Sequence, residues 1–302
     1  MIISASRRTD IPAFFSNWFM NRVREGYFYS VNPFNSNQIT KVSLESPDVD
    51  AICFWTKNPR PLIKHLIELE NLGLNYYFQF TLNPYGKEFE PGLPSLEKRI
   101  ATFRALSGQI GQERVVWRYD PVILSNATPV EWHLERADFI ASSLSGRTDR
   151  LVFSFCDFYG KGRGRLRSSL KNTGIILEDI TDSLHEKEMV KLVKGFRAVA
   201  DRYELSIFSC CEDIGLEKFG VTTGACIDPI LIQKLFNRQI SSRKDKNQRK
   251  ACKCAGSVDM GAYNSCGYRC RYCYANFNDR MIDVNVLKHH PDAPCIIPHY
   301  KV

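Results

Sequence analysis

The sequence predicts an α/β fold, in the form of a TIM-like partial (β/α) barrel with a cysteine-rich C-terminal segment. Short apolar runs, rich in β-branched and aromatic residues, alternate with longer segments of helical periodicity. The runs are apolar along nearly their whole length, as expected for parallel strands covered by helices on one face and by a core on the other. An open doubly wound sheet is the alternative that the same alternation allows.

The elements follow in order along the chain. Helical periodicity continues after each of the first five apolar runs, and Thr128 with Glu131 three residues later has the pattern of a capping box. A β-hairpin over residues 27–44 interrupts the alternation after the first helix. The predicted strands are 2–5, 51–55, 76–82, 115–119, 151–155 and 205–209, and the predicted helices are 14–25, 61–72, 96–106, 130–144 and 186–203.

Length and composition indicate one large domain. The 302 residues, 44% of them hydrophobic, suffice for a full-sized core, which we expect to divide into a barrel over 1–220 and a cysteine-rich segment over 221–302 that completes it. The net charge of +8 is a modest basic excess that favours anionic partners without identifying one. No apolar run has bilayer length and Arg7 comes too early for a signal peptide, so we expect a cytoplasmic protein with no membrane contact.

Cysteine is the most informative residue type. Eleven cysteines are many for a reducing compartment, and an odd number argues against a disulfide framework, so metal binding is favoured. Cys266, Cys270 and Cys273, which we call the cysteine triad, lie within eight residues. Three close thiolates suit three irons of a four-iron cluster and leave the fourth iron open, whereas structural zinc normally takes four ligands. Zinc is the alternative metal.

The triad resembles the CxxxCxΦC motif of the radical S-adenosylmethionine superfamily, in its spacing and in the aromatic Tyr272 before the last cysteine. The resemblance implies a 4Fe-4S cluster on the triad, S-adenosylmethionine on the open iron, a 5′-deoxyadenosyl radical as oxidant, and a reducing partner such as flavodoxin or ferredoxin. The superfamily usually carries this motif after its first strand. A motif near residue 270 therefore implies a permuted barrel, with a strand at 257–261 before the loop and a helix at 277–287 after it.

The same resemblance implies contacts to the cofactor. Ser4, Ser6 and Arg7 stand where the superfamily holds the amino group of the methionine moiety, although its usual Gly-Gly-Glu is absent. Tyr272 within the motif is a further candidate. Arg118 and Asp120, at the end of the fourth predicted strand, are alternative cofactor contacts.

Nearly the whole chain also resembles a bacterial domain-of-unknown-function family (1848), noted for C-terminal cysteines similar to the radical motif. This resemblance does not indicate a substrate. It is carried by the sequences at residues 4–10 (SASRRTD), 54–59 (FWTKNP), 117–121 (WRYDP) and 245–249 (DKNQR).

Cationic side chains at the strand ends suggest what the substrate is. Active sites of (β/α) barrels lie at the carboxyl ends of the strands, and Arg8 and Lys57 follow two of them. The glycine-rich segment 160–167 follows a third and contributes Lys161, Arg163 and Arg165. These residues predict an anionic substrate, phosphate-bearing or nucleic acid, with a merely solvated basic loop as the competing interpretation.

The remaining cysteines predict a second metal site, holding another 4Fe-4S cluster or zinc. Its ligands are Cys210, Cys226, Cys252 and Cys254, which we call the four-cysteine cluster, with Cys211 as the replacement for Cys210. Ordinary buried thiols are the competing interpretation, and we assign no role to Cys53, Cys156 and Cys295.

Two other function classes stay open. A zinc-stabilised nucleic-acid-binding protein without redox chemistry would also account for paired cysteines and a positive charge. An iron–sulfur electron carrier is the third alternative, and it would need four ligands for each cluster.

Overall fold

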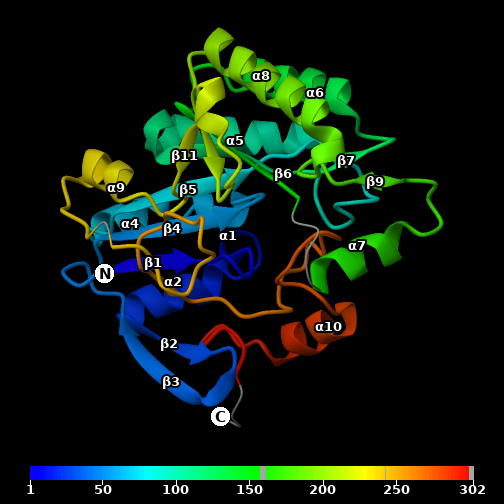
Figure 1. The fold of residues 1–302 in the computed structure, drawn as a ribbon. Helices are drawn as coiled ribbons and strands as arrows, with labels where there is room; N and C mark the ends of the chain where they lie inside the picture. Colours follow the sequence, from blue (N-terminus) through cyan, green and yellow to red (C-terminus); the bar gives the residue numbers. More distant parts are fainter. Residues whose placement is uncertain (157–160, 242, 299–302) are drawn as a thin grey trace.

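A parallel sheet forms the centre of the protein. The computed structural model describes residues 1–156, 161–241 and 243–298, and in this part of the chain eight strands form one sheet (Figure 1). Every neighbouring pair in it is parallel. In spatial order the strands are β12 (Val258–Asp259), β1 (Ile2–Ala5), β4 (Ala51–Thr56), β5 (Tyr76–Thr81), β6 (Val115–Val122), β8 (Arg150–Phe155), β10 (Ser206–Cys210) and β11 (Thr222–Gly224).

The α/β class is thereby confirmed, and so are the six predicted strands. From β1 to β11 the spatial order follows the chain, and the last strand, β12, is added beside the first. β6 extends three residues beyond its predicted end at 119, because Val122 still pairs with Phe155 of β8 after a register shift. β11 was not predicted, since three residues with a glycine carry little hydrophobic signal.

Each predicted helical segment contains a helix, two of them divided, whereas α7 and α9 were not predicted. The first becomes α1 (Ile11–Phe14), capped by Asp10, and α2 (Ser16–Glu25); the second becomes α3 (Arg60–Ile63) and α4 (Leu66–Asn71). None of the helices in the described ranges is both long and apolar enough to span a membrane. The others are α5 (Leu96–Ile110), α6 (Val130–Ser143), α7 (Lys161–Leu170), α8 (Glu186–Arg202), α9 (Pro229–Phe236), α10 (Asp279–Lys288) and the short η1 (Gln112–Arg114), η2 (Ser183–His185) and η3 (Leu216–Phe219).

The predicted capping box before α6 is wrong. Pro129 occupies the cap position and makes no side-chain cap hydrogen bond. The Thr128 hydroxyl instead donates to the Ile123 carbonyl at 2.7 Å, which fixes the turn between β7 (Leu124–Ser125) and the helix. The hydroxyl therefore satisfies a buried carbonyl instead of capping the helix.

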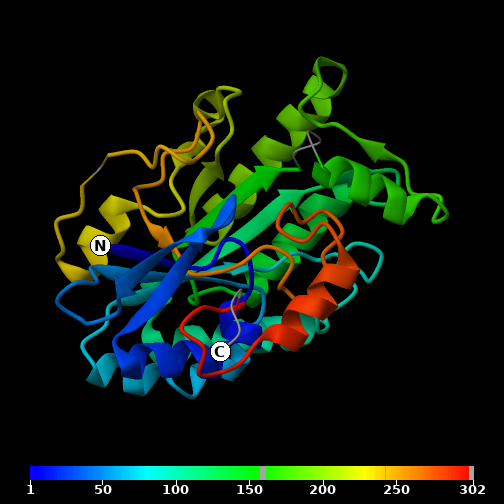
Figure 2. The same cartoon turned by 90° about the horizontal axis from the view of Figure 1, so that it is seen from below.

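The predicted hairpin is present and packs against the C-terminal tail. β2 (Tyr27–Asn32) and β3 (Asn35–Ser43) are antiparallel, and a second small antiparallel pair joins β7 to β9 (Leu177–Glu178). In Figures 1 and 2 the tail, in red, runs beside the hairpin and α2. The Trp18 indole donates to the Ala293 carbonyl at 2.8 Å, and the Tyr29 amide donates to the Pro294 carbonyl at 2.7 Å. Segments from the two ends of the chain therefore hold each other.

The two faces of the sheet have different coverings. Alternate strand residues such as Ile52 and Phe54 join the large cluster under the outer helices. Their neighbours Ala51 and Cys53 belong to a second cluster, which includes α9 and the cysteine-bearing residues 226–255. Because strand side chains alternate, one face packs on helices and the other on the cysteine-rich segment.

His133 of α6 is a buried structural histidine, and we expect it to make stability depend on pH. Its Nε2 donates to the Ile123 carbonyl at 2.9 Å, which leaves Nδ1 to accept from the Tyr119 hydroxyl at 2.8 Å. Burial lowers the pKa of His133 from 6.5 to about 4. The unfolded chain therefore takes up a proton first as the pH falls, and up to about 3 kcal/mol of stability is lost between pH 6.5 and 4.

Urea unfolding at several pH values tests this expectation. The His133→Gln variant should show less loss of unfolding free energy over that pH interval than the parent chain. Equal pH dependence of the two proteins would contradict it.

Candidate functional site

The cysteine triad lies on the loop between β12 and α10, beside the end of the sheet where the polar strand termini meet. Figure 1 shows this orange segment next to α10 and α7. Cys270 is buried and packs with Leu93 and Tyr268, and Cys266 and Cys273 adjoin the same cluster. Electrostatic interactions link the Cys266 thiol to both of the others. The structure therefore brings the three predicted ligands together.

Backbone amides point at two of the three sulfurs. The Tyr268 amide lies near the Cys266 sulfur and lowers the pKa of that thiol, and the amides of Ala275 and Asn276 have the same effect on the pKa of Cys273. Burial nevertheless raises the pKa of Cys266 well above the usual thiol value. Thiols that are costly to ionise by themselves, yet already surrounded by donors, are suited to ionise when a metal replaces their protons.

Three thiols are the donor set that a four-iron cluster with one open iron requires. Among the described residues, no three or more His, Cys, Asp or Glu side chains are grouped so that they could hold one metal ion. The three thiolates of a four-iron cluster bind three different irons, so they need not converge on one point. Buried sulfurs with amide donors are the setting in which proteins hold such clusters and tune them through hydrogen bonds.

The triad loop is fixed to the chain segment that follows β5. The Arg271 amide donates to the Phe89 carbonyl at 2.9 Å, and the Gly92 amide donates to the Tyr268 carbonyl at 3.2 Å. A Cβ on Gly92 would lie 2.8 Å from that carbonyl oxygen, closer than real contacts allow. Only glycine lets the two backbones approach this closely.

We expect the Gly92→Ala variant to bind less iron. The added methyl group must push the triad loop away from residues 86–94, which displaces Tyr268 and the adjoining cysteines. Iron and sulfide per chain after anaerobic reconstitution should fall several-fold. Gly256→Ala is the control, because a Cβ there meets nothing within 4 Å and its φ, like that of Gly92, is not positive.

Tyr272 of the motif belongs to a buried charge network with Lys57 and Glu90. The Lys57 ammonium donates to the Glu90 carboxylate at 2.7 Å and to the Tyr272 hydroxyl at 2.8 Å, and that hydroxyl donates to Glu90. Arg99 lies 3.8 Å from the second Glu90 oxygen. Lys57, which was predicted to contact substrate, is thus paired with a carboxylate. Through Tyr272 it also holds the triad loop.

Ser4, Ser6 and Arg7 all bond to Asp259 of β12. The two hydroxyls donate to its carboxylate at 2.9 and 2.6 Å, and the Arg7 amide donates at 2.9 Å. These predicted cofactor contacts therefore lie together at the end of β1. In this structure they hold β1 to β12, the strand that leads into the triad loop.

Arg118 and Asp120, the other predicted cofactor contacts, form an ion pair at the end of β6. Burial would raise the pKa of Asp120, but the Arg118 guanidinium and the Ser154 hydroxyl outweigh it and hold this pKa below its usual value. The Asn83 side chain accepts a hydrogen bond from the Asp120 amide at 2.9 Å and donates one to the Tyr272 hydroxyl at 3.2 Å. The pair is thereby connected to the triad motif.

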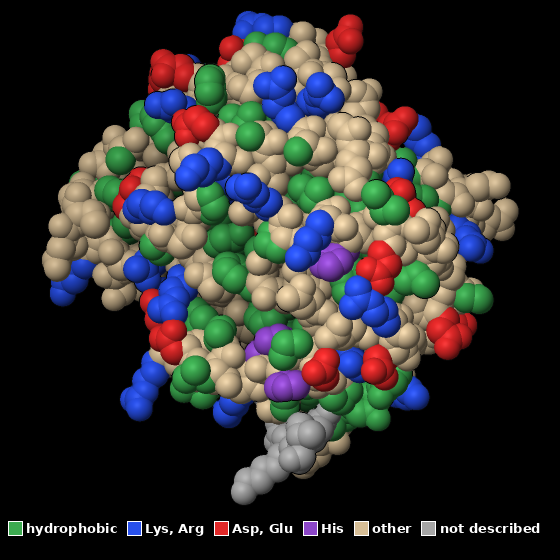
Figure 3. Space-filling view, turned by 180° about the vertical axis from the view of Figure 1, so that it is seen from behind, with side chains coloured by type: hydrophobic (Ala, Val, Ile, Leu, Met, Phe, Trp, Pro, Cys, Tyr) green, Lys and Arg blue, Asp and Glu red, His purple; other side chains and the backbone are tan. Residues whose placement is uncertain are grey.

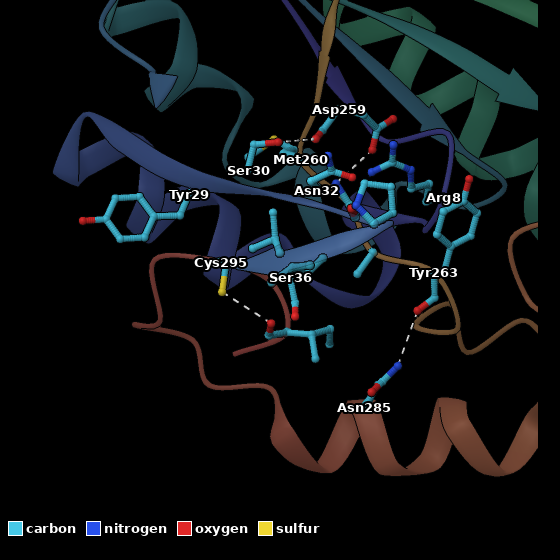
Figure 4. Close-up of a pocket in the computed structure, with 16 residues that line it drawn as sticks. Arg8, Tyr29, Ser30, Asn32, Ser36, Asp259, Met260, Tyr263, Asn285 and Cys295 are labelled. Carbon is cyan, nitrogen blue, oxygen red and sulfur yellow. Dashed lines mark hydrogen bonds between the residues drawn. The ribbon is translucent and has the colours of Figure 1, made fainter. Parts of the chain in front are cut away.

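Arg8 faces a cavity on the other side of β12, away from this network (Figure 4). Its guanidinium lies over the Tyr263 ring, 5.2 Å from the centroid, and donates to the Gly261 carbonyl at 3.4 Å. The cavity, of about 140 Å³, is enclosed by the hairpin, the chain after β12 and the tail at residues 295–297. Arg8 is thus placed apart from the other predicted substrate contacts.

The basic segment is a helix rather than a glycine-rich loop. Gly160 and the side chains of Lys161 and Arg163 lie outside the described residues. Arg165 of α7 pairs with Asp279 of α10 at 2.5 Å, and its charge interacts with Cys273.

Figure 3 shows the face opposite that of Figure 1, where Lys and Arg side chains are mixed with Asp and Glu.

The four-cysteine cluster is also brought together. The sulfurs of Cys210 and Cys226 are 2.9 Å apart, and the Cys254 thiol is hydrogen-bonded to those of Cys226 and Cys252. Cys210, not Cys211, makes the contact with Cys226. The cluster lies on the sheet face that faces the cysteine-rich segment.

Sequence reasoning missed several residues that shape the site. Asp10 accepts from the Thr56 hydroxyl and the Lys57 amide and lies near Cys266, and burial raises its pKa to about 7. Glu90, Asn83 and Asp259 were missed as well. Asp10 and Asn83 follow predicted strands, which was a usable signal, whereas nothing in the sequence marks Glu90.

Comparison with known proteins identifies the family. No curated protein matches the chain. A solved structure described as "a putative alpha-L-fucosidase from Bacteroides thetaiotaomicron" is 12% identical, with a TM-score of 0.28 over 58% of this chain and 68% of that one. The model of the family described as "Domain of unknown function (DUF1848)" matches residues 2–275. The chain therefore belongs to the DUF1848 family.

Proposed function

We propose that this protein is a radical S-adenosylmethionine enzyme whose cluster is held by Cys266, Cys270 and Cys273. The observation that carries the proposal is the fixed triad loop. Its three thiols lie in one buried group, with backbone amides aimed at the sulfurs of Cys266 and Cys273. The order of elements adds support: strand, cysteine loop and helix are β12, the triad loop and α10.

The fold supports the permuted form of the barrel. With β12 placed first, the eight strands of the described sheet follow the chain order from edge to edge. A parallel sheet built in sequential order is what a partial (β/α) barrel requires, whereas a doubly wound sheet reverses its order at a switch point. The permutation explains how a motif near residue 270 lies beside the N-terminal strand.

The chain's residues hold and orient the site. A bound 4Fe-4S cluster and S-adenosylmethionine would supply the chemistry, which is reductive cleavage of the sulfonium to a 5′-deoxyadenosyl radical. The Lys57 ammonium is close enough to Cys270 to favour its thiolate. Glu90 and Lys57 fix the Tyr272 hydroxyl, which stops the loop from moving relative to β4 and β5.

We also propose that the substrate is anionic, either a phosphate-bearing molecule or a nucleic acid. The proposed electron donor is flavodoxin or ferredoxin. Of the described cations predicted to contact substrate, Lys57 and Arg165 are paired with carboxylates. Arg8 donates to a backbone carbonyl at a cavity, so it is the better candidate to meet an anion.

Anaerobic reconstitution with iron and sulfide tests the function. The Cys252→Ser/Cys254→Ser variant is used beside the parent chain, so that metal at the four-cysteine cluster does not confuse the result. We expect about four irons and four sulfides at the triad, and 5′-deoxyadenosine after reduction with S-adenosylmethionine.

Two results would overturn the proposal. One is tight zinc at the triad without iron, which is expected for a zinc-stabilised binding protein. The other is a reducible cluster that never cleaves S-adenosylmethionine, which is expected for an electron carrier.

A further inference from the structure

We propose that the four-cysteine cluster is a second metal site, which binds one zinc ion through the thiolates of Cys210, Cys226, Cys252 and Cys254. The site is separate from the triad. The proposal does not rest on radical chemistry and would stand if the triad had another role.

Three chain segments converge at this site. Cys210 is the last residue of β10, and Cys226 follows β11, its parallel neighbour. Cys252 and Cys254 come from the segment that covers the same face of the sheet, which is held there by the Ala255 amide donating to the Ile227 carbonyl at 3.0 Å. Residues separated by up to 44 positions in the sequence thus contact each other through sulfur.

The contacts between the sulfurs suit one ion rather than a four-iron cluster. They form a continuous series, from Cys210 to Cys226, from Cys226 to Cys254 and from Cys254 to Cys252. A tetrahedral zinc site, with Zn–S bonds of about 2.3 Å, holds its sulfurs roughly 3.8 Å apart. The distance between the sulfurs of Cys210 and Cys226, now 2.9 Å, must therefore increase only slightly when zinc binds.

The thiols contact one another in pairs and are not yet arranged around a shared point, in keeping with the absence of a preformed single-ion group among the described residues. The proposal requires zinc to draw the four sulfurs into a tetrahedron. Two backbone amides already point at sulfur: the Ile227 amide lies 3.4 Å from Cys254 and the Cys254 amide 3.5 Å from Cys252.

Charge provides an independent argument. Arg118 is buried, and its Nη1 lies 2.7 Å from the Cys226 sulfur. Nη2 of Arg7 is buried without a hydrogen-bond partner in the described structure, and this guanidinium interacts electrostatically with Cys254 and Cys226. Buried cations require a compensating anion. Four protonated thiols carry no charge.

Zinc binding supplies that anion. Zn²⁺ displaces four thiol protons, and the resulting tetrathiolate complex has a net charge of −2, which faces the two guanidinium groups. Asp120 compensates part of the Arg118 charge. The Arg7 guanidinium already interacts with the Asp259 carboxylate and donates to the Ser257 hydroxyl through Nη1, and ionised thiols would add a second negative charge beside it.

Cobalt and zinc titration tests the site. The chain is purified anaerobically, stripped of metal and titrated with Co²⁺, both as the parent and with the triad replaced by Cys266→Ala/Cys270→Ala/Cys273→Ala. We expect about one Co²⁺ per chain in the replaced form, with intense sulfur-to-cobalt charge-transfer absorption, displacement by Zn²⁺ and proton release.

Variants identify the ligands. Cys226→Ser and Cys252→Ser should each weaken Zn²⁺ binding at least about tenfold, while Cys211→Ser, the matched control beside Cys210, should bind as the parent does. If the triad replacement does not fold, the zinc content of the parent grown without added iron is compared with that of the Cys252→Ser/Cys254→Ser variant, which should hold about one zinc ion fewer. The proposal fails if no ion binds stoichiometrically, if iron and sulfide occupy these cysteines, or if Cys210 and Cys226 form a disulfide.

Discussion

Replacing Cys270 by serine is expected to abolish cluster binding at the triad and, with it, cleavage of S-adenosylmethionine. Cys270 is the most buried of the three triad cysteines. A hydroxyl ionises far less readily than a thiol and is a poor ligand for iron in a cluster. Changes around a metal site commonly cost ten- to a hundredfold, so loss of a direct ligand should lower 5′-deoxyadenosine formation by at least about a hundredfold.

The measurements are iron and sulfide content at the triad and the rate of 5′-deoxyadenosine formation, again in the Cys252→Ser/Cys254→Ser background. Cys211→Ser serves as the control, because it removes a half-buried thiol outside the triad. Circular dichroism separates loss of ligand from loss of fold. Full cluster content in Cys270→Ser would show that the triad does not hold the metal.

Replacing Glu90 by glutamine should lower the free energy of unfolding by about 3–5 kcal/mol, the cost of leaving buried charges without their partner. The Glu90 side chain is fully buried and lies against both Lys57 and Arg99. Glutamine keeps the size and removes only the charge, so both cations would stay buried and uncompensated. Urea unfolding measures the loss.

The double variant Glu90→Leu/Lys57→Met is the control. It removes both charges of the closest pair and should recover much of the stability, since Arg99 retains bonds to the Pro94 and Asn83 carbonyls at 3.1 and 3.0 Å. If Glu90→Gln cost less than about 1 kcal/mol, the network would be solvated in solution and would not fix Tyr272.

Much of the framework could be predicted from hydrophobic pattern, because the strands of a covered parallel sheet are apolar throughout. Ile2 to Ala5 illustrates this: the run was predicted as a strand and forms β1 with the same bounds. α7 was missed because glycine and arginine alternate in it, which is typical of a loop. Asp228 and Pro229 were an available start signal for α9 that was not used.

The sequence singles out the triad cysteines but not the residues that contact their loop. The spacing of three cysteines is a local pattern, so the sequence shows it directly. Glu90 matters through Lys57, 33 positions earlier, and Tyr272, 182 positions later. Such contacts depend on the register of distant segments, which one sequence does not reveal.

The position of β12 at the end of the chain has a consequence for biosynthesis. A ribosome delivers every other strand of the described sheet before it delivers Val258–Asp259 and the triad. Domains generally begin to fold from the N-terminal side during translation. If the triad holds a cluster as proposed, its three cysteines are made only after the other strands of the described sheet, and β12 then pairs with β1, the first of them. A chain released early would carry a nearly complete sheet and no means of holding the cluster.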